Sequence, residues 1–203
     1  MAARRTRGLT GSGVSGTTVT RATAIAEQLR YEVSILLDLY KKRESFTADL
    51  TLTDGRLVSV PPPSSQLDTR DKLWRLHSAL LQCRSLLERS IAKEDEELGD
   101  GKKGDYETRR KMVKDRLSLL LITTGELLKA ADGAAALTPS VEGLELDDPT
   151  VTFELKLWVY RIYKEVDYWT KTAITTLQAL PTVIAKERAR TTGRVRSTRS
   201  ARR

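Results

Sequence analysis

Apolar residues recur at steps of three or four between Phe153 and Leu180, and this spacing constrains the fold more than any other feature of the chain. Each residue of an α-helix advances by about 100° around the axis, so these steps line a single helix face. The stripe comprises Leu155, Trp158, Ile162, Val166, Trp169, Ala173, Leu177 and Leu180. We therefore predict a long amphipathic helix that buries this face in a core.

Phe153 and Lys156 lie on the opposite side of the same predicted helix. At about 100° per residue, Phe153 is roughly 140° and Lys156 roughly 160° from Trp158, whereas the two are only about 60° apart. An aromatic ring beside an ammonium on an outer face favours a protein partner that covers both. The alternative is that Phe153 packs beneath a crossover at residues 133–147 and that Lys156 is solvated.

Breaks in the apolar pattern divide the chain into four predicted helices, at about 18–43, 66–98, 104–132 and 149–190. Pro61, Pro62 and Pro63 exclude helix from the first link, three glycines between positions 99 and 104 end the second helix, and Pro149 suits the first turn of the fourth. No strand is predicted. Four helices with one apolar stripe each predict an all-α four-helix bundle.

The lengths of the links restrict the order of the helices. The second link is too short to span a helix, so the second and third helices must be antiparallel neighbours. The first and third links are long enough to return along a whole helix. This pattern predicts the up-up-down-down arrangement of long-chain bundles with two long crossover loops. An ordinary up-down bundle with longer loops is the alternative.

The sequence pattern also suggests structural roles for several single residues. Trp158 and Trp169 lie on the core stripe, whereas Trp74 lies one position off the stripe of its helix and is expected to be covered by a loop. The acidic run from Glu94 to Glu97 is interpreted as a solvated helix end. Asp148 is interpreted as a helix cap before Pro149.

The formal net charge of +8 is concentrated at the two ends of the chain. Residues 186–203 contain eight basic side chains against one glutamate, and residues 1–17 contain three arginines. We therefore expect a disordered segment at 1–17, a helical domain at 18–190 and a basic disordered tail at 191–203. The tail supports a rival function, the binding of a polyanion such as nucleic acid or heparin.

The residues required for most enzymes are scarce. Cys83 is the single cysteine and His77 the single histidine, so neither an intramolecular disulfide nor a metal site of the CxxC type can form, and the usual catalytic base is lacking. No enzymatic activity, cofactor or metal is predicted. No apolar stretch is long enough for a membrane helix, and the amino terminus lacks the apolar run of a signal peptide.

The residues Phe153-Glu-Leu-Lys-Leu-Trp158, followed by Trp169-Thr170, resemble the fourth helix of a known family. This family is the ciliary neurotrophic factor and leukaemia inhibitory factor group of interleukin-6-type long-chain helical cytokines. The segment from Ile25 to Tyr40 is similar to their first helix without gaps, and the segment from Leu73 to Leu87 matches more loosely.

The resemblance implies an extracellular, monomeric growth factor that assembles cell-surface receptors and triggers JAK-STAT signalling. Phe153 and Lys156 match the Phe-x-x-Lys pair that contacts a leukaemia inhibitory factor receptor type chain. A surface on the first and third helices would bind the shared signal-transducing glycoprotein. Arg30 and Lys171 are candidates for a third surface that binds a ciliary neurotrophic factor α receptor. Without a signal peptide, we expect a cytoplasmic store and non-classical release.

Overall fold

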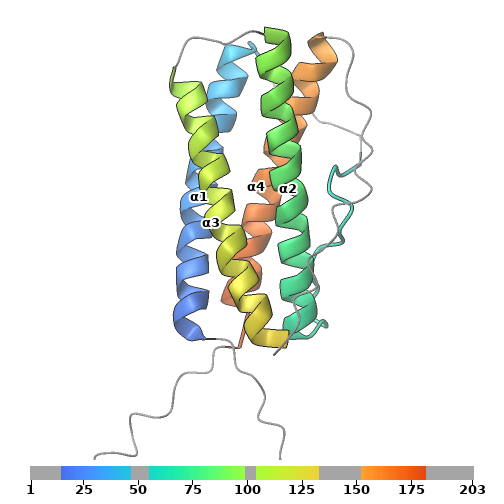
Figure 1. Ribbon diagram of the computed structural model, residues 1–203. Coiled ribbons are helices and arrows are strands. Elements are labelled where there is room, and N and C mark those ends of the chain that lie inside the picture. The colour runs from blue at the N-terminus through green and yellow to red at the C-terminus, as the bar shows by residue number, and fades with distance from the viewer. Residues whose placement is uncertain (1–14, 47–54, 99–103, 133–151, 182–203) are drawn as a thin grey trace, which may run out of the picture.

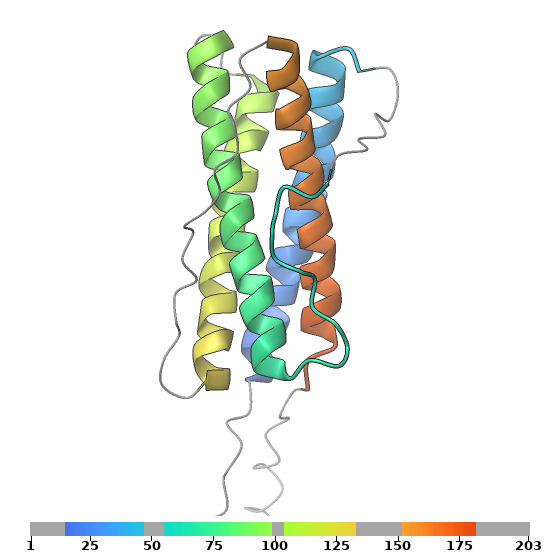
Figure 2. The same cartoon turned by 90° about the vertical axis from the view of Figure 1, so that its right-hand side faces the viewer.

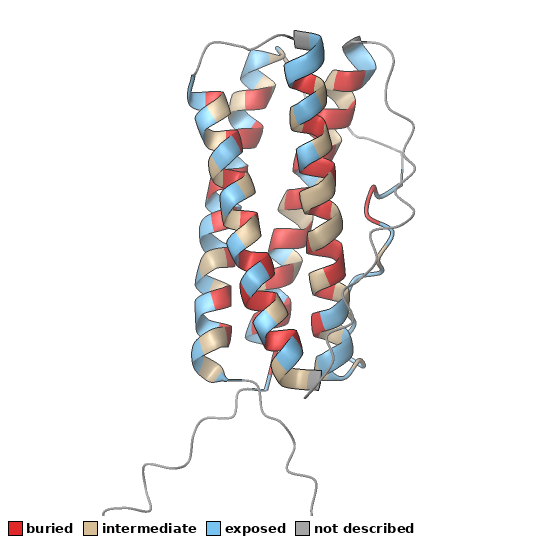
Figure 3. Cartoon of the chain, in the orientation of Figure 1, coloured by how far each residue is buried: buried red, intermediate tan, exposed pale blue. Residues whose placement is uncertain are grey.

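The computed structural model describes residues 15–46, 55–98, 104–132 and 152–181, and these residues form four helices without any strand (Figure 1). The helices are α1 (Gly16–Arg43), α2 (Thr69–Leu98), α3 (Asp105–Asp132) and α4 (Thr152–Gln178). They lie side by side as one bundle, and their buried residues face its interior (Figure 3). The prediction of an all-α four-helix bundle is therefore confirmed.

The core is built from the stripes that the sequence spacing identifies. On α4, Leu155, Ile162 and Trp169 are fully buried or nearly so, and Trp158 is only 6 % exposed. Each of the other helices contributes its own leucine-rich face. The side chain of Trp74, by contrast, is 42 % exposed, so our expectation that a loop covers it is wrong.

Each helix packs against two others: α1 and α2 both contact α3 and α4. Tyr40, near the end of α1, donates a hydrogen bond to the carbonyl oxygen of Lys156, near the start of α4 (3.0 Å). Arg110, near the start of α3, pairs with Glu94, near the end of α2. Antiparallel neighbours follow from these contacts, and the colours of Figure 1 show α1 and α2 running in one direction and α3 and α4 in the other.

Part of the link between α1 and α2 is an extended segment that lies along α2 and α4 (Figure 2). Its residues Leu57 and Val58 are buried. The Arg56 guanidinium carbon lies 3.5 Å from the centroid of the Tyr168 ring, and the Ser59 backbone N–H donates to the amide oxygen of residue 82, a glutamine (3.1 Å). The crossover expected at 133–147 lies outside the described residues, as do residues 1–14 and 191–203 of the two expected disordered ends.

Three predicted helix boundaries need correction. The first helix begins at Gly16 rather than near residue 18. The fourth ends at Gln178 rather than near residue 190, and Pro181 accounts for this because proline disfavours helical geometry in the residue before it. The second begins at Thr69 rather than near residue 66. The Asp68 carboxylate sets this boundary, because it accepts a hydrogen bond from the backbone N–H of residue 71 (2.7 Å) and so caps the first turn.

Gly125 is a weak point in the middle of α3, and replacing it with alanine should stabilise the protein. Glycine in a helix interior costs about 1 kcal/mol relative to alanine. A Cβ at this position would lie 3.4 Å from Cε1 of His77, an ordinary van der Waals contact. We expect Gly125→Ala to raise the free energy of unfolding by about 0.5–1 kcal/mol in urea titrations. A loss of stability would mean that the His77 ring cannot accommodate the methyl group.

Candidate functional site

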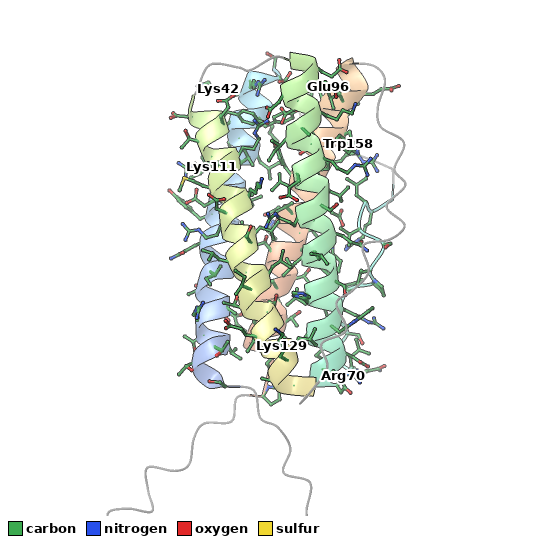
Figure 4. The ribbon with its side chains drawn as sticks, viewed as in Figure 1. Lys42, Arg70, Glu96, Lys111, Lys129 and Trp158 are labelled. Carbon is green, nitrogen blue, oxygen red and sulfur yellow. The ribbon has the colours of Figure 1, made fainter. Side chains whose placement is uncertain are left out.

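The start of α4 presents Phe153 and Lys156, which we call the α4 start site. Phe153 is 62 % exposed, so the ring is not sealed in the protein interior. Trp158, two residues beyond Lys156, is buried in the same part of the bundle (Figure 4). The outward position of Phe153 follows from the helical spacing, because it is roughly 140° from Trp158 around the axis.

Lys156 is held by the end of α1. Its ammonium nitrogen lies 2.7 Å from Oε2 of Glu44, and the lysine side chain is 32 % exposed. The Glu44 side chain is only 5 % exposed, and its other oxygen, Oε1, lies 3.3 Å from Nε of Arg43. Lys156 is therefore ordered in the free protein by a partner that the helical spacing of α4 does not identify.

A tight turn at the end of α1 places Glu44. The backbone N–H of Glu44 donates to the carbonyl of Tyr40, and that of Phe46 donates to the carbonyl of the lysine at position 41, both at 2.9 Å. Ser45 has φ 56°, the left-handed conformation that commonly ends a helix. The turn also packs the Phe46 ring edge-on against the ring of Tyr160, with centroids 5.7 Å apart. The end of α1 is thus fixed on the first turns of α4.

Behind this turn lies a group of hydrogen-bonded polar side chains, which we call the buried polar cluster. Its centre is the Glu94 carboxylate, which is 3 % exposed and accepts hydrogen bonds from Tyr106 Oη (2.8 and 2.9 Å). The hydroxyls of Tyr106 and Tyr163 are 2.6 Å apart. Nη1 of Arg110 lies 3.0 Å, and Nη1 of Arg43 3.7 Å, from Glu94 oxygens. The cluster takes one or more members from each of the four helices.

Burial governs the ionisation of this cluster. Burial raises the pKa of Glu94 above the usual range of a glutamate, although the Tyr106 hydroxyl and the two arginines oppose the shift. Burial also raises the pKa of Tyr106 and of Tyr163 well above that of an ordinary tyrosine. The tyrosines therefore stay protonated as hydrogen-bond donors, and the cluster has the composition of a structural network.

The buried polar cluster corrects one interpretation made from the sequence. We interpreted the acidic run from Glu94 to Glu97 as a solvated helix end, but Glu94 is buried because it points into the bundle at the inward face of α2. Asp95, Glu96 and Glu97 are exposed, as expected, and Figure 4 shows Glu96 at the end of α2. The interpretation is therefore wrong for the first residue of the run and correct for the other three.

Arg30 and Lys171 flank the interface between α1 and α4. Nζ of Lys41 lies 5.9 Å from the centroid of the Tyr160 ring across this interface. Arg30 lies three helical turns before Lys41 and therefore has nearly the same azimuth as Lys41 on α1. Lys171 lies three turns after Tyr160 and has nearly the same azimuth as Tyr160 on α4. Because α1 and α4 are antiparallel, Arg30 and Lys171 both lie roughly 16 Å from the Lys41–Tyr160 contact, toward the same end of the bundle. Both side chains are exposed, and Lys171 forms an ion pair with Asp167 (2.6 Å).

The surface formed by α1 and α3 carries exposed apolar residues that the sequence stripes did not identify. Tyr31 is 65 %, Leu119 46 % and Ile122 56 % exposed. Arg116 hydrogen-bonds to Gln28 across the two helices. Tyr31 lies three residues after Gln28, and Leu119 lies three residues after Arg116. Residues three positions apart are neighbours on a helix surface. The only signal in the sequence was that these apolar residues lie off the core stripes.

Other classes of site find no support among the described residues. In that part of the chain no group of three or more His, Cys, Asp or Glu side chains could hold a metal ion. None of the helices described is long and apolar enough to cross a membrane. No protein-family model matches the chain, and no curated protein is significantly similar to it in sequence.

Proposed function

We propose that this protein is a cytokine or neurotrophic growth factor that catalyses no reaction and instead brings two signalling receptor chains together. The observation that carries the proposal is the exposed Phe153 ring at the start of the fourth helix, three residues before the ordered Lys156. An exposed aromatic anchor beside a charged group is typical of the residues that dominate protein–protein binding energy. The partner at the α4 start site would be a leukaemia inhibitory factor receptor type chain.

The arrangement of the bundle supports the same class of protein. Two parallel helices packed against two helices of the opposite direction fit the up-up-down-down order with long crossovers that long-chain cytokines adopt. In this proposal the α1 and α3 surface around Tyr31, Leu119 and Ile122 binds the shared signal-transducing glycoprotein. Arg30 and Lys171 would contact a ciliary neurotrophic factor α receptor. A rigid bundle then sets the angle between two receptors, and their associated kinases start JAK-STAT signalling.

Binding to purified receptor ectodomains tests the proposal. We expect the full chain to bind the leukaemia inhibitory factor receptor type ectodomain and the shared-transducer ectodomain at the same time, in surface plasmon resonance with one ectodomain immobilised and the other injected afterwards. Binding to neither ectodomain would contradict the proposal.

A truncated chain provides the comparison with polyanion binding. Deleting residues 186–203 removes the arginine-rich tail. Receptor binding through the helical faces should survive this deletion. Affinity that is lost with the tail and falls steeply with salt would instead support binding to heparin or nucleic acid.

A further inference from the structure

The carboxylate of Glu44 lies between the α4 start site and the rest of the bundle. Oε2 of Glu44 accepts from the Lys156 ammonium at 2.7 Å, and Oε1 lies 3.3 Å from Nε of Arg43. With its side chain only 5 % exposed, Glu44 offers almost no surface to a partner protein. An effect of Glu44 on binding would therefore act through the side chains that it contacts, Lys156 and Arg43.

The position of Glu44 is itself fixed from two sides. The turn at the end of α1 holds its backbone, through the hydrogen bond to Tyr40 and the left-handed conformation of Ser45. Arg43 holds its carboxylate. The Arg43 guanidinium carbon in turn lies 4.6 Å from the centroid of the Tyr106 ring, and Nη1 lies 3.7 Å from the central carboxylate of the buried polar cluster. The contact to Lys156 thus rests on a rigid support.

An ordered lysine is more favourable for binding than a mobile one. A free lysine side chain loses much of its rotamer freedom when it is fixed at an interface, and ordering it beforehand removes that cost from the binding step. The ammonium has three N–H donors, so the contact with Glu44 leaves donors for a partner's oxygen atoms. Because the Glu44 side chain is charged and only 5 % exposed, separating Lys156 from it on binding would be unfavourable.

We propose that Glu44 is a positioning residue for the receptor contact: it holds the Lys156 ammonium in place at the α4 start site so that Lys156 donates to an oxygen acceptor of the partner while it stays paired with Glu44. This inference rests on the proposed function of the α4 start site. It adds a buried residue from the end of α1 to a binding surface that otherwise consists of α4 residues.

A double-mutant cycle tests the inference with the purified leukaemia inhibitory factor receptor type ectodomain as the probe. The variants are Glu44→Gln, Lys156→Ala and the two combined. We expect Glu44→Gln to weaken binding about fivefold in the wild-type background, and to have no further effect once Lys156 is alanine. Binding to the shared-transducer ectodomain should not change. Equal weakening by Glu44→Gln with and without Lys156 would overturn the positioning role.

A matched control is available at the same arginine. The Glu107 carboxylate also lies near Arg43, with its Oε1 3.8 Å from Nη1. We expect Glu107→Gln to change receptor affinity less than twofold, because the role of Glu44 depends on its contact with Lys156. A Glu107→Gln effect as large as that of Glu44→Gln would contradict the inference, since it would mean that the charge around Arg43 matters rather than the position of Lys156.

Circular dichroism and thermal unfolding of every variant separate misfolding from weaker binding. Glu44→Met keeps the length of the side chain without its charge and serves as a second variant. If both Glu44 variants fail to fold, Glu44 is a residue of the fold and the inference is overturned. If the wild-type chain does not bind this ectodomain at all, the proposed function is wrong. If the chain binds but the effects of the Glu44 and Lys156 substitutions are additive, the positioning role of Glu44 is wrong and the proposed function is unaffected.

Discussion

Replacing Phe153 with alanine is expected to weaken binding to the leukaemia inhibitory factor receptor type chain by about 30-fold or more, and the Phe153→Ala/Lys156→Ala double variant is expected to abolish signalling. Truncating a central aromatic anchor of an interface typically costs about 2 kcal/mol or more, which corresponds to this loss of affinity. Phe153 is 62 % exposed in the free protein, so its removal takes away little internal packing. STAT phosphorylation in receptor-bearing cells is the measurement.

Trp74 provides the matched control for this experiment. It is another large aromatic side chain with substantial exposure, 42 %, but it belongs to α2. We expect Trp74→Ala to leave signalling unchanged. As a second control, the Phe153 and Lys156 variants should still bind the shared transducer normally. Normal signalling by the double variant would show that the α4 start site is not the receptor contact.

The periodicity of apolar residues was sufficient to predict the helices and most of the core. It placed Trp158 and Trp169 in the interior and Phe153 outside, because helix azimuth depends only on the spacing along one chain segment. The end of α4 was predicted wrongly, because the basic residues beyond Pro181 have side chains that are compatible with a helix. Here the backbone restriction imposed by proline outweighed helix propensity.

The contacts of charged residues could not be predicted in the same way. Glu44 follows α1 directly, and its contact with Lys156 joins residues more than a hundred positions apart. Such pairs depend on how the helices pack, which periodicity within a helix does not specify. Glu94 had one overlooked signal, because it falls at helical spacing from Leu87 and Ile91 on the inward stripe of α2. A charged residue on that stripe indicates buried partners.

Removing the Glu94 carboxylate is expected to cause a large loss of stability. Glu94→Ala leaves Arg110, which is 8 % exposed, without its closest buried counter-charge, and it removes the carboxylate acceptor of Tyr106. Breaking a buried ion pair from one side typically costs about 3–5 kcal/mol. We expect a loss of this size in urea unfolding. Glu96→Ala, in the same acidic run but at an exposed position, should change the unfolding free energy by less than about 0.5 kcal/mol.

The pH dependence of unfolding distinguishes the charge of Glu94 from its shape. Because burial raises the pKa of Glu94, the folded protein binds its proton more tightly than the unfolded chain does. The resulting stabilisation is fully present below the usual pKa of a glutamate and is lost as pH rises through the raised pKa. Glu94→Gln keeps the side-chain volume but cannot ionise, so wild type should lose stability relative to this variant as pH rises through that window. A constant difference between the two proteins across the window would contradict the assignment, because it would mean that the Glu94 carboxylate binds its proton equally in the folded and unfolded states.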